Sequence, residues 1–148
     1  MKYASLLAVP IIILGLAGAQ ALADDEGKPF AEASIVLQMA DGDAESQTRV
    51  LNVANNLIKH YGGPDFVDIE IVAYGPGLSL LFPGGANEER ISSLLANDVR
   101  FVACMNTAES IERATGKRPE LIPDAIPVQT GVARLVERAQ QGFVVIRP

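Results

Sequence analysis

The chain has 148 residues, and its 12 basic and 18 acidic side chains give a formal net charge of −6 at pH 7. This acidic balance, with no run of basic residues, excludes nucleic-acid binding, because phosphate contacts need clustered Lys and Arg. A single cysteine excludes an internal disulfide, so the fold must rest on its hydrophobic core.

Residues 1–23 have the layout of a secretory signal peptide. Lys2 gives a positive start, an apolar run follows, and Ala21-Leu22-Ala23 supplies a small-x-small cleavage site. The run of about 15 apolar residues is shorter than the roughly 20 that a spanning helix needs, and an uncleaved anchor is the alternative. We therefore expect a periplasmic protein that is cleaved after Ala23 and is free of the membrane after cleavage.

The segments that follow begin with a polar, flexible lead-in over 24–32. Ala33–Met39 is short, apolar and β-branched, which predicts a buried strand. Ser46–Tyr61 predicts a helix, because its apolar residues recur on one face and glycines follow it. Val67–Tyr74 predicts a second strand. Acidic residues alternate with isoleucines at the start of this strand: Asp68, Ile69, Glu70 and Ile71.

Beyond this strand, Gly75-Pro76-Gly77 turns the chain into LSLLF, which predicts a short helix or turn. The remaining elements, in chain order, are a helix that begins at Asn87 or Glu88, a strand over Phe101–Cys104, a helix over Thr107–Thr115, a short strand within Ile126–Gln129, a helix over Gly131–Gln141 and a strand over Phe143–Arg147. This alternation indicates one α/β domain over residues 33–148, with a mainly parallel sheet of about five strands covered on both faces.

The single cysteine falls where an expected strand gives way to a helix. Ligands of open α/β sheets bind at the carboxyl ends of the strands, so Cys104 lies at the expected site edge. Asn106 or Thr107 is the expected N-cap of the next helix. Helix N–H groups and the helix dipole favour a thiolate there, which makes Cys104 a candidate catalytic residue. An inert core cysteine is the alternative.

The Gly-Pro-Gly loop is a second candidate at the same edge. Its glycines let the backbone approach a ligand closely, and exposed N–H groups in such a turn can hold an anion. An ordinary turn between strand and helix is the alternative. The candidate ligand-binding residues are Tyr74, Gly75, Pro76, Gly77, Asn106 and Thr107.

Metal and cofactor chemistry finds little support in the sequence. The single histidine, His60, lies at the far end of its helix from the site edge and is interpreted as a surface residue. Asp41, Asp43 and Glu45 are candidates for a divalent cation, but Asp43 or Ser46 is better interpreted as a helix cap. We expect no metal site and no cofactor.

Three segments, EIVAYGPGLSLL, VRFVACMNT and GVARLVERAQQGFVVIRP, together resemble the DsrE/DsrF-like family of sulfur-relay proteins. The likeness runs from Ser34 to Pro148. The resemblance implies a flavodoxin-like three-layer sandwich that assembles into trimers or hexamers. It also implies a cysteine after the third strand that carries sulfur as a persulfide, and this cysteine matches Cys104.

Two classes of function remain open. In the first, the chain is a sulfur carrier or transferase, and Cys104 takes sulfane sulfur from a donor and passes it to a thiol acceptor protein. In the second, it is a non-enzymatic module that binds a small ligand or serves oligomeric assembly, with LSLLF as an interface segment. A less favoured version of the second class binds a soft metal through Cys104 and Met105.

Overall fold

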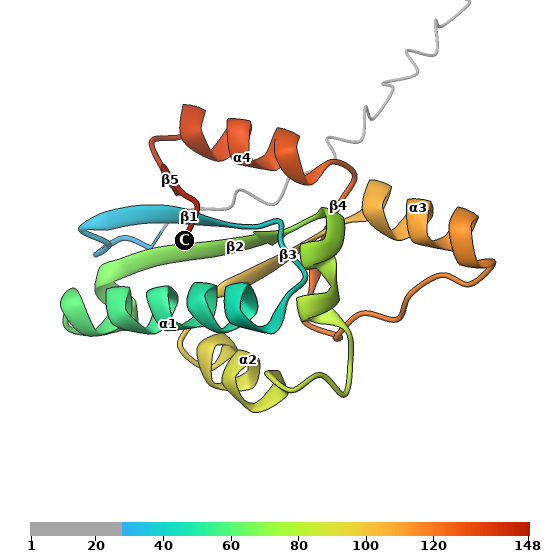
Figure 1. Cartoon of the computed structure of the whole chain (residues 1–148). Helices are drawn as coiled ribbons and strands as arrows, with labels where there is room; N and C mark the ends of the chain where they lie inside the picture. The colour runs from blue at the N-terminus through green and yellow to red at the C-terminus, as the bar shows by residue number, and fades with distance from the viewer. Residues whose placement is uncertain (1–27) are drawn as a thin grey trace, which may run out of the picture.

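The computed structural model describes residues 28–148 (Figure 1). The expected signal peptide, 1–23, and the lead-in up to residue 27 lie outside the described residues. Within 28–148, every helix is too short or too polar to cross a membrane. The elements are β1 Ala33–Met39, α1 Ala44–His60, η1 Pro64–Phe66, β2 Val67–Ala73, η2 Gly75–Leu81, α2 Glu88–Leu95, β3 Arg100–Cys104, α3 Met105–Thr115, β4 Ile126–Val128, α4 Gly131–Gln140 and β5 Val144–Ile146, where η marks a 3-10 helix.

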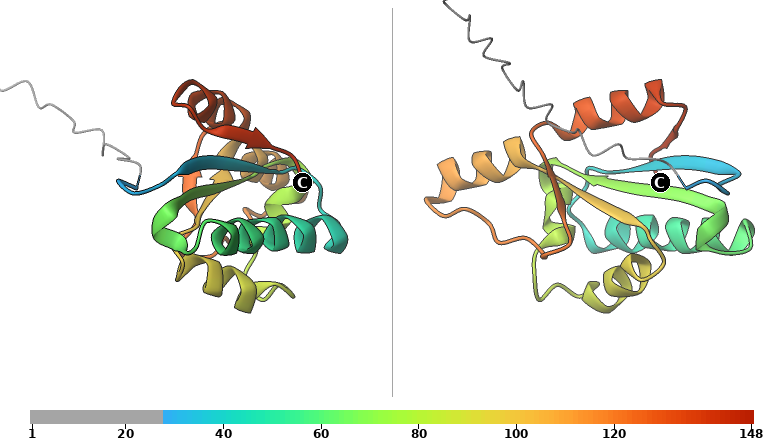
Figure 2. Two further views of the ribbon diagram at one scale, coloured as in Figure 1. Left: turned by 90° about the vertical axis from the view of Figure 1, so that its left-hand side faces the viewer. Right: turned by 180° about the vertical axis from the view of Figure 1, so that it is seen from behind.

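The five strands form one sheet in the order β4-β3-β2-β1-β5, and every neighbouring pair is parallel. The helices α1 and α2 lie on one face of the sheet and α4 on the other, which gives three layers (Figures 1 and 2). This confirms the predicted α/β class and its flavodoxin-like arrangement. The carboxyl ends of the strands meet at one edge of the sheet, and α3 extends outward from that edge (Figure 1).

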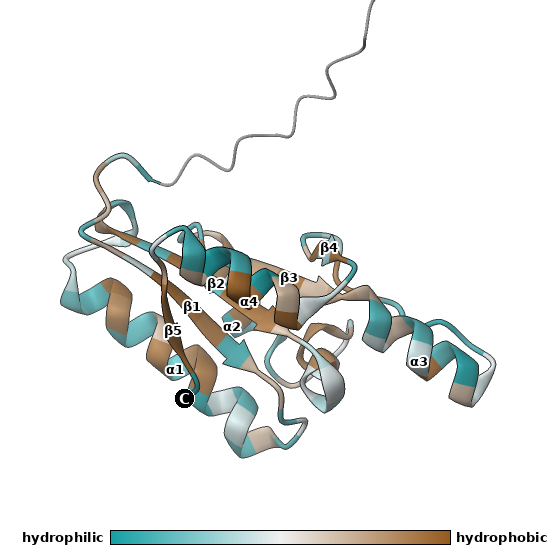
Figure 3. Ribbon diagram, turned by 90° about the horizontal axis from the view of Figure 1, so that it is seen from above, coloured by the Kyte–Doolittle hydropathy of each residue, from teal (hydrophilic) through white to brown (hydrophobic). Residues whose placement is uncertain are grey.

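The main hydrophobic core lies between the sheet and the α1 and α2 layer. Alternate residues of β1, β2 and β3 point into it, and Leu37, Ile71 and Phe101 are fully buried there. Figure 3, seen from the side of α4, shows largely apolar strands and helices of mixed polarity. Leu78 and Leu81 of η2 are also fully buried in this core. The interpretation of LSLLF as an interface segment is therefore wrong.

The opposite face of the sheet buries two carboxylates under α4. Asp68 and Glu70 are both fully buried. Glu70 accepts hydrogen bonds from Arg134 at 2.8 and 3.0 Å and from Arg138 at 2.9 and 2.6 Å. Arg100 Nη1 lies 2.9 Å from Asp68 Oδ1, and its Nε lies 3.3 Å from Glu70 Oε2. Alternation of acids with isoleucines is typical of a strand with a solvated face, but here three guanidinium groups allow the acids to be buried.

Two element boundaries are corrected by the structure. The first helix begins at Ala44, because Asp43 is its N-cap and accepts the Ser46 N–H at 2.8 Å. This hydrogen bond lowers the pKa of Asp43 and confirms the capping interpretation. The Gly-Pro-Gly segment is part of η2 rather than a loop before it, with Pro76 in the first turn, where proline is well tolerated.

Candidate functional site

Cys104 ends β3 and is itself the N-cap of α3. The prediction that Asn106 or Thr107 caps this helix is wrong, because α3 begins at Met105 with no linking residue after the strand. Cys104 keeps an extended backbone, with φ −76° and ψ 112°, and makes no side-chain capping bond. The thiol therefore lies beside the first turn of α3, whose N–H groups lack partners within the helix.

A second helix also begins at this thiol. Gly131 is the first residue of α4, and a Cβ added to it would lie 3.1 Å from the Cβ atoms of both Cys104 and Tyr74. Only glycine fits there without displacing a neighbour. Both α3 and α4 thus begin at the carboxyl edge of the sheet (Figure 1). Gly131 is not among the candidate residues selected from the sequence, although a poor helix former at the start of a predicted helix was a usable signal of close packing.

The surroundings of Cys104 are polar although the residue is only 5% exposed. Burial raises the pKa of the thiol, but the neighbouring Thr107 side chain and the backbone of Gly131, Thr107 and Asn106 lower it further, so the pKa lies below the ordinary value of 9.0. As a neutral thiol, Cys104 lies 3.8 Å from the Gln129 carbonyl oxygen and can donate to it. Cys104 belongs to neither of the two apolar clusters.

The turn after β2 reaches the site through one hydrogen bond. The Gly75 N–H donates to Thr107 Oγ1 at 2.9 Å, which ties η2 to the first turn of α3. The Gly77 N–H donates to two backbone carbonyls at 3.0 and 3.1 Å, so it is not available to a bound anion. Gly77 has a steric role instead, because a Cβ there would collide with the Met39 carbonyl at the end of β1.

The Asn106 side chain ties α3 to the segment that precedes α4. Its Nδ2 donates to Thr130 Oγ1 at 3.0 Å, and its Oδ1 accepts from Gln129 Nε2 at 2.6 Å. Tyr74 is half-buried against the smaller apolar cluster, and Pro76 is exposed. The residues that the structure brings together around Cys104 are Gly75, Asn106, Thr107 and the unforeseen Gly131.

The residues considered for metals have other partners. Met105 Sδ lies 3.9 Å from Arg118 Nη2, and a guanidinium beside the thioether disfavours a cation. Asp41 pairs with Arg147 at 3.0 Å. His60 is exposed at the last turn of α1, as predicted. Over residues 28–148, no three His, Cys, Asp or Glu side chains gather in a way that could hold a metal ion.

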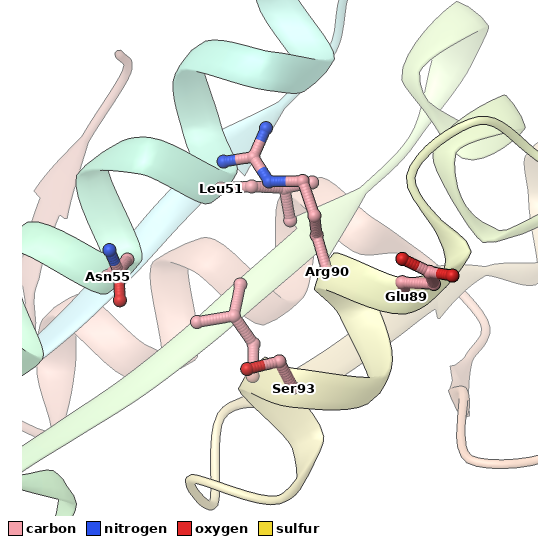
Figure 4. A pocket seen from close by; sticks show the side chains of 6 residues that line it. Leu51, Asn55, Glu89, Arg90 and Ser93 are labelled. Carbon is pink, nitrogen blue, oxygen red and sulfur yellow. The ribbon is translucent and has the colours of Figure 1, made fainter.

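Two surface hollows lie on other elements. One, of about 330 Å³, lies between α1 and α2 and is lined by Leu51, Asn55, Glu89, Arg90, Ser93 and Leu94 (Figure 4). Its guanidinium is held to α1, because Arg90 Nη2 donates to Asn52 Oδ1 at 2.6 Å. A smaller hollow, of about 190 Å³, lies between η2, α2 and residues 122–124. Neither hollow is lined by a residue that surrounds Cys104.

Comparison with known proteins bears on the fold. No family model matches the chain, and no curated protein matches it. Among solved structures, a protein of unknown function from Methanobacterium thermoautotrophicum is similar, with 29% identity and a TM-score of 0.69 over 79% of this chain and 100% of that chain. This likeness agrees with the three-layer α/β arrangement described above.

Proposed function

We propose that the protein is a sulfur carrier or sulfurtransferase that holds sulfane sulfur as a persulfide on Cys104. The observation that carries the proposal is the convergence of two helix N-termini on one thiol. Helix N-termini stabilise anions, and the thiolate is the nucleophilic form of cysteine. The resemblance of the three sequence segments to the DsrE/DsrF-like family supports the same reaction.

Loading is a displacement at sulfur. The Cys104 thiolate attacks the outer sulfur of a persulfide donor, R–S–SH, and a new S–S bond forms on Cys104. The S–S bond of the donor breaks, and its electron pair leaves with R–S⁻. The thiolate of an acceptor protein then attacks the outer sulfur and releases the Cys104 thiolate. The two steps need no external oxidant or reductant.

The geometry also supports a reaction without a general base. The lowered pKa of Cys104 increases the fraction of thiolate at any pH below 9.0, and the thiolate needs no proton acceptor at the moment of attack. The N–H groups of Gly131 and Thr107 are placed to hold negative charge on the sulfur. The reaction therefore has no need of His60, which lies at the opposite end of α1.

The test is the intact mass of the mature protein after brief incubation with inorganic polysulfide at neutral pH. The wild type is expected to gain one sulfur atom, about 32 Da, as a persulfide. The matched control, Cys104→Ser, is expected to gain none. A wild type that keeps its mass, and whose thiol reacts with an alkylating agent only in denaturant, would overturn the proposal.

A second candidate, a non-enzymatic assembly module, is favoured by one specific observation. Val132 and Val136 lie one turn apart on the outer side of α4 and are 52% and 53% exposed. We call this pair the valine stripe. The edge strand β5 also exposes Val144 and Val145. We propose that these side chains contact other copies of the chain in a trimer or hexamer, a state compatible with either function.

We also propose that the protein is exported to the periplasm. The charged start, apolar run and small-x-small site within residues 1–23 support export. N-terminal sequencing of protein from the periplasmic fraction tests it, and Asp24 is expected as the first residue. Recovery from the cytoplasm with Met1 intact would overturn the proposal.

A further inference from the structure

The helix α4 begins without the side-chain cap that its sequence could provide. Thr130 is the N-cap residue of α4, and a threonine at this position normally accepts a backbone N–H of the first turn with its own hydroxyl. Thr130 makes no such bond. The first hydrogen bond of the helix runs from the Arg134 N–H to the Thr130 carbonyl, so the N–H groups of residues 131–133 have no partner within the helix.

The Asn106 side chain accounts for the missing cap. Its Nδ2 donates to Thr130 Oγ1 at 3.0 Å, which holds the hydroxyl toward α3. The amide is oriented for this contact, because its Oδ1 accepts from Gln129 Nε2 at 2.6 Å and its Nδ2 is then left to face Thr130. A further bond, from the Asn106 N–H to the Gln129 carbonyl at 3.0 Å, joins the backbones of the two segments.

The uncapped start of α4 lies at the thiol. A Cβ added to Gly131 would lie 3.1 Å from Cys104 Cβ, and the Gln129 carbonyl oxygen lies 3.8 Å from Cys104 Sγ. The residues on both sides of Thr130 thus lie against Cys104. A threonine hydroxyl bonded to the first-turn N–H groups of α4 would compete with the sulfur for them.

We propose that Asn106 is a positioning residue that draws the Thr130 hydroxyl away from the α4 N-terminus and so leaves the first-turn N–H groups of α4 to the Cys104 sulfur. This inference rests on the sulfur-transfer function proposed above. It gives Asn106 a role at the site through its neighbours rather than through direct contact with a ligand. The lowered pKa of Cys104, to which the Gly131 backbone contributes, agrees with this role.

Charged and titratable groups on the elements around Cys104 also bear on the ionisation of the thiol. Glu109 on α3 accepts from Gln129 Nε2 at 3.3 Å, and Arg134 on α4 is bonded to Glu70. Tyr74 follows β2, and neither η2 nor β4 carries a charged residue. The other charged residues of β2, β3, α3 and α4 are Asp68, Arg100, Glu112, Arg113, Glu137 and Arg138. All of them are retained in the variants below, so their effect on the thiol is common to every variant.

The test combines two substitutions in the mature full-length chain. Asn106→Ala frees the Thr130 hydroxyl, and Thr130→Val keeps the branched shape but removes that hydroxyl. The rate of alkylation of the single cysteine by iodoacetamide is measured as a function of pH, because the midpoint of the profile reports the ionisation of the thiol. Asn106→Ala is expected to raise the midpoint and to slow alkylation about tenfold at neutral pH, since a hydrogen bond to the charged sulfur is lost. Thr130→Val, alone or combined with Asn106→Ala, is expected to keep the wild-type midpoint.

Recovery in the double variant separates positioning from a merely structural role. An unshifted midpoint in Asn106→Ala overturns the inference, and so does a double variant that stays shifted, because no hydroxyl is then left to cap α4. A raised midpoint in Thr130→Val alone also overturns it. A shift that recovers in the double variant, in a protein whose wild type gains no sulfur from polysulfide, overturns the function and leaves the role of Asn106 standing. Asn106→Ser, which lacks the amide donor, takes the place of Asn106→Ala if circular dichroism shows that alanine prevents folding.

Discussion

At the scale of single residues, Gly131 holds the start of α4 against the thiol because it has no side chain. We predict that Gly131→Ala destabilises the fold by about 1–3 kcal/mol and reduces sulfur loading, since the new methyl group lies against Cys104 and Tyr74 and neither can move freely. Urea unfolding and intact mass measure the two effects. Gly85→Ala, in the turn before α2, is the matched control and should load normally. Normal stability and loading in Gly131→Ala would contradict the packing described here.

The ionisation of Cys104 gives a second prediction at this scale. Burial raises the pKa of the thiol, but its hydrogen bonds lower the pKa further, to below 9.0. The thiolate fraction, and with it the rate of sulfur loading, should therefore rise with pH and reach half of its maximum below pH 9.0. Initial loading rates over a pH series check this. A half-maximal rate at pH 9.0 or above would show an ordinary thiol.

The sequence predicted part of this site. Cys104 and Thr107 were selected because they follow an apolar strand, and that inference needs only the sheet rule. The N-cap was misplaced because the Asn106 N–H donates to the Gln129 carbonyl at 3.0 Å, an interaction between segments 23 residues apart. Gly131 was missed for the same reason, since its contact with Cys104 depends on how α4 docks on the sheet.

At the scale of the elements, α4 is held to the sheet by buried charges. Glu70 raises the pKa of Arg134, and burial lowers the pKa of Arg138, whose side chain is only 2% exposed. Arg138 also lies over the Phe143 ring at 4.7 Å. Because Gly131 begins the same helix, the contacts of Arg134 and of Arg138, which lies in the last turn, also hold the helix N-terminus beside Cys104.

We predict that Arg138→Met destabilises the protein by about 3–5 kcal/mol, because it removes one partner from a buried ionic cluster. Arg49→Met is the matched control. The Arg49 pair with Glu45 lies on the exposed side of α1 at 3.5 Å, so this change should alter stability by less than about 1 kcal/mol. Urea unfolding of both variants measures the difference. Equal effects would show that Arg138 contributes no more than a surface charge.

Strands and helices were predicted to within a few residues, because hydrophobic periodicity is a local property. The buried ionic cluster was not predicted, because its members are far apart in the chain. These members are Asp68, Glu70, Arg100, Arg134 and Arg138. Glu70 is separated from Arg100 by 30 residues and from Arg138 by 68. The local sequence pattern around Asp68 and Glu70 is the same whether this face of the strand is solvated or packs against arginines. Only the tertiary structure determines which of the two environments the acids have.

At the scale of the whole molecule, the valine stripe bears on assembly. We predict that the wild type is a trimer or hexamer and that Val136→Lys shifts it toward monomer, because a charge would be placed in an apolar contact. Light scattering coupled to size-exclusion chromatography measures the mass. Gln140→Lys, an exposed position of the same helix, is the control and should leave the mass unchanged. A monomeric wild type would contradict the assembly proposal.

The pairing of β5 with β1 also has a consequence for the order in which the chain folds. Ile35 pairs with Val144, so the contact closes a loop of about 110 residues, and such distant pairings form slowly. Until β5 arrives, one edge of β1 keeps unpaired N–H and C=O groups, which can pair with a neighbouring chain. In a protein exported across a membrane as an unfolded chain, the segment that protects the first strand would be among the last to emerge. During the delay between the emergence of β1 and that of β5, newly made chains are most exposed to mispairing with one another.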